Sequence, residues 1–382
     1  MNAIRALKIL SVPTVFAIYV GCSPVTFSKD DQINRCQNFG QNCVALNGKD
    51  HFDYSLSAAG GKVDILIVDD NSASMSFEQA RLASRLSNFI ENLENQKADY
   101  RIAVTTTDIS SPNNGPRAVN QNGALQDGKL IKFPNGESFL TNSSGTLTQK
   151  DEWFKKTISR DETISCESFI RNNYGKSGFS TSYDANCPSG DERGVYAANL
   201  VIKNNPSGFI RQGAHLAVIF LADEDEAVTY NSSGVPVYHL EDLDQPDVLI
   251  NNVTQIFGPA KLLSAHSLIT ATESCFAEQN NQMAAYGVRG SYGWNYARLS
   301  QKTQGYIGDI CAGDYTSQLG QISTNILNKI NSVPLACENP SDLVVSISAA
   351  NITYTVSGRE LKFSAQLPPG STVSLKYSCE TL

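Results

Sequence analysis

The chain has 382 residues, of which 41% are hydrophobic and 18% are charged. This composition is typical of globular domains and excludes a disordered, collagen-like or coiled-coil chain. With 30 Lys and Arg against 38 Asp and Glu, the formal net charge is −8. The chain therefore lacks the basic excess that binding to a nucleic-acid backbone requires. Its length accommodates two or three domains.

The first residues indicate an export signal. Arg5 and Lys8 supply positive charge before an apolar run over 9–20. A membrane-spanning helix needs about twenty apolar residues, so this run is too short to be a permanent anchor. Residues 1–21 are therefore predicted to be a signal peptide.

The end of this signal, Tyr19-Val20-Gly21-Cys22, resembles a bacterial lipobox, with Tyr19 where an aliphatic residue is usual. The resemblance implies cleavage before Cys22 and lipidation of its thiol. In such lipoproteins a residue other than Asp after the cysteine, here Ser23, implies delivery to the outer membrane, on its periplasmic or its cell-surface face. An ordinary secretory signal is the alternative.

The remaining cysteines are even in number: Cys36, Cys43, Cys166, Cys187, Cys275, Cys311, Cys337 and Cys379. In an exported chain this predicts four disulfides, for which eight cysteines allow roughly a hundred pairings. The simplest of these joins each cysteine to its neighbour in the sequence. A zinc site is disfavoured because no CxxC or CxH spacing occurs.

Residues 22–61 are polar and are expected to form a tether that carries a small Cys36/Cys43 loop. A buried strand over 63–68 follows, and it ends at Asp69-Asp70. Apolar residues at spacings of three, four and seven then predict a helix from Met75 to Leu93.

Strand and helix patterns alternate from there on. Strands are expected over 101–107, 215–221, 266–271 and 305–310, and helices over 192–202, 246–263 and 315–330. A long insertion over about 110–190 separates the second strand from the next helix. The alternation predicts a doubly wound, mostly parallel, Rossmann-like sheet flanked by helices over 62–335. Short segments rich in Val, Thr and Ser over 336–382 predict a small C-terminal antiparallel β unit.

A candidate cation site lies where the first strand of this sheet meets its helix. Asp70, Ser72 and Ser74 form a D-x-S-x-S motif there. A carboxylate and two hydroxyls on one sharp turn are hard oxygen ligands of the kind that Mg²⁺ takes. A second acidic stretch, from Asp223 to Glu226, follows a later strand, and ligands of such sheets bind beyond the carboxyl ends of the strands. The alternatives are helix capping by the two serines and a solvated acidic turn.

The strand, the D-x-S-x-S motif and the acidic turn together resemble the von Willebrand factor type A domain and its metal-ion-dependent adhesion site. The resemblance covers about 62–333. It implies that Asp70, Ser72 and Ser74 hold Mg²⁺ or Mn²⁺, with Ca²⁺ also compatible, and that Asp223 is a distal ligand. A partner's carboxylate would then complete the coordination of the ion.

One part of the family pattern is missing. The family usually supplies a Thr before a central helix, whereas this chain has Asp191 and Glu192 near that position. An acidic side chain there would compete with a partner's carboxylate. The site is therefore either open to a ligand or closed by Asp191 or Glu192.

The function expected from these features is non-covalent. The domain would bind a protein or another extracytoplasmic ligand, in adhesion or in an interaction within the envelope, and would not be an enzyme. An envelope scaffold with a structural metal or none is the alternative, and a metal-dependent phosphoesterase is less favoured. A response-regulator receiver, which opens with a similar acidic pair, conflicts with the export signal.

Overall fold

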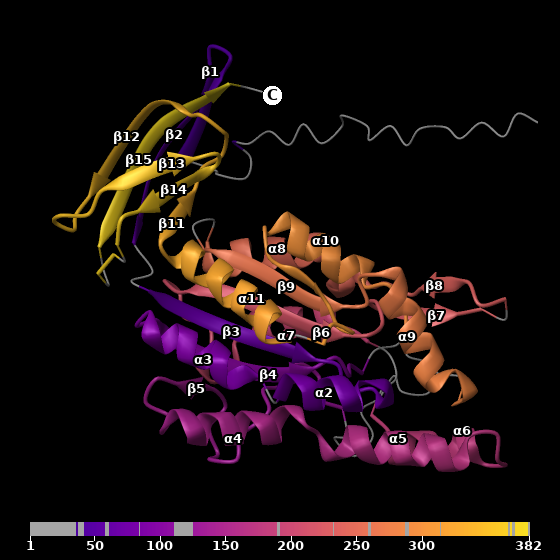
Figure 1. Ribbon diagram of the computed structural model, residues 1–382. Coiled ribbons are helices and arrows are strands. Elements are labelled where there is room, and N and C mark those ends of the chain that lie inside the picture. The colour runs from indigo at the N-terminus through magenta and orange to yellow at the C-terminus, as the bar shows by residue number, and fades with distance from the viewer. Residues whose placement is uncertain are drawn as a thin grey trace, which may run out of the picture. The chain divides into compact units, whose positions relative to one another are not determined.

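The computed structural model describes residues 36, 42–57, 61–83, 85–110, 125–188, 192–231, 233–258, 261–286, 290–313, 315–365, 367–368 and 371–380 (Figure 1). These residues belong to one compact unit. The predicted signal peptide, the lipidation site Cys22 and Asp191 lie outside the described residues.

A six-stranded mixed sheet forms the centre of the α/β domain, in the order β10-β9-β6-β3-β4-β5. Its strands are β3 (Lys62–Asp69), β4 (Asp99–Thr106), β5 (Leu140–Thr141), β6 (His215–Ala222), β9 (Leu263–Ile269) and β10 (Ile307–Asp309). All neighbours pair in parallel except β5, which runs antiparallel to β4 at the edge. The mixed α/β fold agrees with the predicted strands.

Helices cover both faces of this sheet because its central strands are apolar on both sides. Ile65 and Ile67 of β3 face one hydrophobic core, and Leu66 and Val68 face the other. The first core includes residues of α2 (Ser76–Ala83), α3 (Leu86–Asn95), α4 (Leu147–Ile158) and α11 (Tyr315–Ile330). The second includes residues of α7 (Gly194–Asn204), α8 (Pro246–Phe257) and α10 (Trp294–Lys302).

Short elements complete the domain. They are η2 (Ala73–Met75), η5 (Pro206–Gly208), β7 (Val228–Tyr230), β8 (Pro236–Tyr238), η6 (Asp242–Asp244), α9 (Glu273–Met283) and η7 (Ala284–Tyr286). The single helix expected after the D-x-S-x-S motif is divided into η2, α2 and α3. The helix expected over 246–263 ends earlier, at Phe257, because Gly258 follows with a positive φ of 87°.

The long insertion contributes β5 and three helices, α4, α5 (Asp161–Asn173) and α6 (Phe179–Asn186). It is fastened to the turn after β3, because the Thr163 hydroxyl donates to the Asn71 carbonyl at 3.0 Å. The Ser76 hydroxyl at the start of α2 also donates to the Glu167 carboxylate at 2.5 Å. The insertion therefore supports the loop that carries the D-x-S-x-S motif.

The segment predicted to be a tether is partly folded into a sheet. β1 (Cys43–Leu46) and β2 (Lys49–Ser57) join β12 (Ser341–Ile347) and β15 (Thr372–Glu380) in the order β1-β2-β15-β12. β2 pairs antiparallel with β15 over nine residues, and Figure 1 shows indigo β2 among the yellow strands. The prediction of a tether over 22–61 is wrong for these residues, since their partner strand comes more than three hundred positions later.

A second, three-stranded sheet belongs to the same β unit. Its strands are β11 (Ser332–Pro334), β13 (Tyr354–Ser357) and β14 (Glu360–Phe363), in the order β11-β14-β13. Buried residues of both sheets, among them Phe52, Leu361 and Leu375, share one hydrophobic core. The β unit therefore combines the first and the last described strands of the chain, and it begins before residue 336.

Four disulfides join each of the eight cysteines to its neighbour in the sequence. They are Cys36–Cys43, Cys166–Cys187, Cys275–Cys311 and Cys337–Cys379. Disulfides of this number are typical of proteins that function outside the cytoplasm. Within the residues that the structure describes, no helix combines the length and the apolarity that crossing a membrane requires.

Candidate metal centre

The D-x-S-x-S motif forms a tight turn at the carboxyl end of β3. The backbone N–H of Asp70 donates to the Leu221 carbonyl at 2.9 Å, which fixes Asp70 beside β6. One carboxylate oxygen of Asp70, Oδ1, accepts a hydrogen bond from the Ser72 N–H at 2.8 Å. The hydroxyls of Ser72 and Ser74 lie 3.1 Å apart. Although Ser72 precedes η2, its side chain makes no capping hydrogen bond, so the helix-capping interpretation does not account for it.

Asp223 lies directly opposite this turn. It follows β6, the strand next to β3, and its carboxyl group lies close enough to the Asp70 carboxyl and the Ser74 hydroxyl for these groups to change its pKa. Asp70 and Asp223 are 0% and 1% exposed. Asp70 Oδ2 and Asp223 Oδ1 are buried without a hydrogen-bond partner. None of the ion pairs formed between described residues includes either carboxylate.

The electrostatics of this pair are unfavourable without a cation. Burial raises the pKa of Asp70 to about 7, although the hydrogen bonds from Ser72 act in the opposite direction. Burial, and then the charge of Asp70, raise the pKa of Asp223 well above its usual range. A divalent cation would restore the charge balance of the two carboxylates, and carboxylate and hydroxyl oxygens are the donors that hard cations take. The residues present therefore fit a divalent metal ion.

Two further acids lie near this turn: Asp69, which the sequence marks as an acidic strand end, and Glu78, which the sequence does not single out. Asp69, the last residue of β3, accepts from the Gln79 amide at 3.1 Å, and Glu78 in α2 accepts from the Gln279 amide at 2.9 Å. Glu78 and Gln79 occupy the buried face of the helix between Met75 and Leu82. Polar residues on the apolar stripe of a helix were the available signal, because burial of such groups requires a partner.

Three acids of the turn after β6, Asp223, Asp225 and Glu226, are buried, so the interpretation of these residues as a solvated turn is wrong. The Glu226 carboxylate accepts hydrogen bonds from the backbone N–H groups of Val195 and Tyr196, at 2.9 and 3.0 Å, at the start of α7. The Asp225 carboxylate accepts from the backbone N–H of Asn295 at 2.9 Å, at the start of α10. These two acids therefore bind helix N-termini, where unpaired N–H groups favour negative charge, whereas Asp223 lies near Asp70.

Glu192 lies at the entrance to α7, near the same edge of the sheet. Its carbonyl accepts from the Ala227 N–H at 2.7 Å, and the next residue, Arg193, donates its N–H to the Thr107 carbonyl at 3.2 Å. The segment therefore lies between the residues that follow β4 and the turn that follows β6. The Glu192 side chain is buried. Asp191, the other candidate at this position, lies outside the described residues.

Two groups of Cys and Asp side chains also lie close together among the described residues. They are Cys36, Cys43 and Asp50, and Cys275, Asp309 and Cys311. In both groups the two cysteines form a disulfide. Because thiolates, and not disulfide sulfurs, are the cysteine ligands of metals, neither group is a metal site.

No family model matches the chain, and no curated protein matches it. Among solved structures, it is similar to the open conformation of the pilus adhesin SpaC from Lactobacillus rhamnosus GG. The identity is 10%, the TM-score is 0.30, and the match covers 88% of this chain and 41% of that one. For the pilus adhesin RrgA from Streptococcus pneumoniae, the identity is 10%, the TM-score 0.32 and the coverage 88% and 60%.

The manganese-loaded TRAP protein of Plasmodium vivax is similar at 11% identity and a TM-score of 0.30, over 84% of this chain and 99% of that one. The chain spans less than half the length of the first two adhesin structures it matches, 41% and 42%. Both the identities and the TM-scores are low. The properties of these proteins are therefore not transferred to this chain.

Proposed function

We propose that this chain is an exported lipoprotein, anchored at Cys22 in the outer membrane, whose type A domain binds a ligand non-covalently through a divalent cation. The observation that carries the proposal is the proximity of Asp70 and Asp223, two buried carboxylates that each have an unpartnered oxygen and form no ion pair with any described residue. Burial of unpaired carboxylates is energetically costly, so the presence of two of them close together favours a bound cation.

In this proposal Asp70, Ser72 and Ser74 hold Mg²⁺ or Mn²⁺, and Asp223 supports the ion from the neighbouring strand. The ion would supply an electropositive point at which a ligand oxygen, such as a partner's carboxylate, binds. The strand order of the sheet, with β3 and β6 adjacent, supports a doubly wound type A fold because it brings the two acidic strand ends together. The proposed role is non-covalent binding and includes no catalytic step.

An aromatic stack on the same edge of the sheet supports a binding role. Phe276 and Tyr292 stack with their ring centres 4.8 Å apart, and Trp294 lies 5.3 Å from Tyr292. Trp294 is 64% exposed. The backbone N–H of Ser291, the residue before Tyr292, donates to the Asp223 carbonyl at 3.0 Å. Exposed Trp and Tyr are the side chains that most often anchor protein interfaces.

Calorimetric titration of Mg²⁺, Mn²⁺ and Ca²⁺ into residues 23–382 tests the cation site, with Asp70→Ala as the comparison. We expect binding by the wild type that the variant loses. Ligand binding is tested by cross-linking in envelope extracts, with Mn²⁺ or with a chelator. A partner retained by the wild type in Mn²⁺, and lost in chelator and in Asp70→Ala, supports the proposal. Absence of metal binding by the wild type contradicts it.

The envelope scaffold is a second candidate, and the burial of Glu192 at the entrance to α7 favours it. In a scaffold, an internal carboxylate would take the coordination position that a ligand needs. Glu192→Gln distinguishes the two functions. If the chain is a binding domain, we expect Glu192→Gln to capture the partner as the wild type does. If the chain is a scaffold, we expect Glu192→Gln to bind Mn²⁺ more weakly than the wild type, and the wild type to retain no partner.

A further inference from the structure

Two buried side chains that are not ligands of the candidate site hold the backbone of the D-x-S-x-S turn. The Gln79 amide of α2 donates to the Asp70 carbonyl at 2.9 Å, and the Thr163 hydroxyl of α5 donates to the Asn71 carbonyl at 3.0 Å. The next carbonyl, that of Ser72, accepts from a backbone N–H of η2 at 3.2 Å. Three successive carbonyls of the turn are therefore fixed, two of them by side chains from outside the motif.

Gln79 and Thr163 belong to one buried network. They are 1% and 0% exposed, and the Gln79 amide nitrogen lies 3.4 Å from the Thr163 hydroxyl. The same nitrogen donates to the Asp69 carboxylate at 3.1 Å. The Gln79 side-chain oxygen accepts from the backbone N–H of Arg160, just before α5, at 3.5 Å. Because buried polar groups require partners in specific positions, the network limits the turn to one backbone arrangement.

The arrangement of this backbone sets where the candidate ligands lie. Asp70, Ser72 and Ser74 are within five consecutive residues, and the Ser72 N–H donates to the Asp70 carboxylate at 2.8 Å. Rotation of the peptide groups between Asp70 and Ser72 would move the serine hydroxyls away from the carboxylate. Groups that hold metal ligands in place typically raise metal affinity by about tenfold to a hundredfold.

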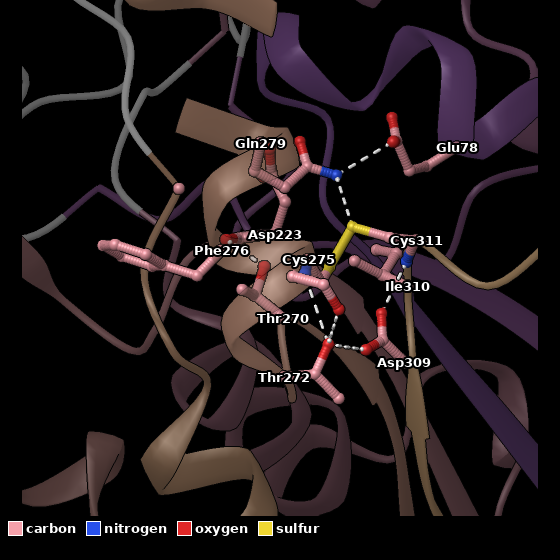
Figure 2. The surroundings of a disulfide bond; sticks show 12 residues. Glu78, Asp223, Thr270, Thr272, Cys275, Phe276, Gln279, Asp309, Ile310 and Cys311 are labelled. Atoms are coloured by element: carbon pink, nitrogen blue, oxygen red, sulfur yellow. Dashed lines mark hydrogen bonds between the residues drawn. A yellow bond between two sulfur atoms is a disulfide. The ribbon is translucent and has the colours of Figure 1, made fainter. Parts of the chain in front are cut away.

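The facing turn, which carries Asp223, is held by residues outside the insertion. The Asp223 carbonyl accepts from the Thr270 hydroxyl at 2.9 Å, as Figure 2 shows, and from the Ser291 N–H at 3.0 Å. Thr270 follows β9, and Ser291 precedes α10. The hydrogen bond from Thr163 therefore gives the insertion a direct link to the D-x-S-x-S side of the site.

A disulfide holds α5 in the place that this hydrogen bond requires. Cys166 lies one helical turn after Thr163 and is bonded to Cys187, which follows α6. Both cysteines belong to one apolar cluster with Ala73 of the D-x-S-x-S motif. The disulfide therefore packs beside the motif and limits the movement of α5 away from the turn.

We propose that Gln79 and Thr163 are positioning residues of the cation site, and that the Cys166–Cys187 disulfide raises the affinity for the cation through Thr163. The inference rests on the proposed function, because it requires that the D-x-S-x-S motif binds a cation. Neither Gln79 nor Thr163 is a ligand. Each holds a carbonyl of the turn whose side chains bind the ion, so the insertion is a working part of the site.

Titration with Mn²⁺ alone tests the role of Thr163 in residues 23–382. Thr163→Val removes the hydroxyl with little change in shape, and we expect it to lower the Mn²⁺ affinity by about tenfold to a hundredfold. Thr163→Ser keeps a hydroxyl and should restore most of the affinity. Thr157→Val is the matched control, because Thr157 is buried in α4 and its hydroxyl donates to the Trp153 carbonyl of the same helix at 2.8 Å.

Melting curves in chelator separate positioning from stability. Both Thr163→Val and Thr157→Val should lower the melting temperature, whereas only Thr163→Val should lower the Mn²⁺ affinity. Equal losses of affinity in the two variants would assign Thr163 a purely structural role and overturn the proposal.

Gln79→Met tests the second positioning residue, and we expect a loss of Mn²⁺ affinity in the same range. Gln318→Met is its matched control. Gln318 is buried in α11 and bonds the backbone N–H and carbonyl of Asp309, at 2.8 and 3.0 Å, at the end of β10. It therefore holds a different strand end at the same edge of the sheet, and its variant should bind Mn²⁺ as the wild type does.

The disulfide is tested by replacing both of its cysteines with serine. Cys166→Ser with Cys187→Ser should weaken Mn²⁺ binding, whereas Cys337→Ser with Cys379→Ser, which removes the disulfide of the β unit, should not. In the Thr163→Val background, loss of the Cys166–Cys187 disulfide should have a smaller further effect. Fully additive losses would show that the disulfide does not act through Thr163, and would overturn that part of the proposal.

The outcomes separate this inference from the function on which it rests. If the wild type binds Mn²⁺, Asp70→Ala does not, and Thr163→Val and Gln79→Met bind with wild-type affinity, the positioning roles are overturned and the proposed function stands. If the wild type does not bind Mn²⁺, both are overturned.

Discussion

Arg193 and Asp244 form a two-point ion pair that is buried on both sides. The guanidinium Nε donates to Asp244 Oδ1 at 3.0 Å, and Nη2 donates to Asp244 Oδ2. The two side chains are 1% and 0% exposed. Because Arg193 directly precedes α7, this pair fixes the entrance to that helix, next to Glu192 and the turn that carries Asp223.

We expect Asp244→Asn to lower the free energy of unfolding by about 1–3 kcal/mol, because it removes the fully buried one of the two carboxylates that pair with Arg193 and leaves only Glu241, at 2.9 Å. Asp247→Asn is the matched control nearby. Asp247 pairs with Arg298 and Lys302 but is about half exposed, so its loss should cost less than about 1 kcal/mol. Denaturant unfolding of both variants measures the difference, and equal losses would show that burial does not set the strength of the Arg193 pair.

Asp70→Asn should change the stability of the fold, relative to the wild type, in opposite directions with and without metal. In chelator we expect it to raise the melting temperature, because it removes a charge from a buried carboxylate pair while its side-chain oxygen still accepts from Ser72. In Mn²⁺ the wild type should gain stability by ligand linkage and the variant should not. Melting curves in both solutions test this, and a variant that melts lower in chelator would assign Asp70 a purely structural role.

The pH dependence follows from the raised pKa of Asp70. Its folded value of about 7 lies above the ordinary 3.8, so the neutral form stabilises the metal-free fold. That contribution is fully present below about pH 4 and is lost as the pH rises through about 7. The wild type in chelator should therefore lose stability over this window relative to Asp70→Asn, as pH-dependent melting would show.

Because the pKa of Asp70 is raised, metal binding should release protons. At pH 6 Asp70, with a pKa of about 7, is mostly protonated, so the ion must displace its proton and Mn²⁺ affinity should rise by about tenfold per pH unit up to about pH 7. Calorimetry at pH 6 in two buffers of different ionisation enthalpy measures the released protons. Identical heats in both buffers would mean that both carboxyls are already ionised.

Glu226→Ala should destabilise the fold without affecting the ion. It removes two hydrogen bonds to the first N–H groups of α7 and leaves those groups buried, which should cost about 2–3 kcal/mol. Mn²⁺ affinity should stay at the wild-type value in the folded variant. A large loss of affinity would instead make Glu226 part of the cation site.

The central strands and the motif were predictable from the sequence because their signals are local. The apolar runs of β3 and β6 are buried along nearly their whole length, as their composition requires. The D-x-S-x-S turn falls at the end of β3, and the turn at Asp223 falls at the end of the adjacent strand. The proximity of Asp70 and Asp223 then follows from strand order, which the sequence pattern alone did not establish.

Other features could not be predicted from the sequence, because they depend on contacts between residues that are far apart in the chain. The sequence predicts a solvated side chain for Glu226, because its hydrogen-bond partners, the N–H groups of α7, lie about thirty positions earlier. Glu78 has the sequence environment of an exposed helical glutamate, and only Gln279 in α9 shows that it is buried. Nearby in the sequence β2 has only the four-residue strand β1 as a partner, and its polar outer face resembles that of a linker.

The pairing of β2 with β15 has a consequence for the order of folding. The two strands of this ladder are separated in the sequence by the entire α/β domain, so β2 has only its hairpin partner β1 until the last described strand of the chain has been synthesised. The backbone groups on its other edge and the apolar side of Phe52 remain open to other chains during that interval. The α/β domain has all its own strands before that point, so we expect it to fold first and to bring the two ends together. A chain that stops before β15 would contain Asp70 and Asp223 yet leave the edge of β2 that pairs with β15 unpaired.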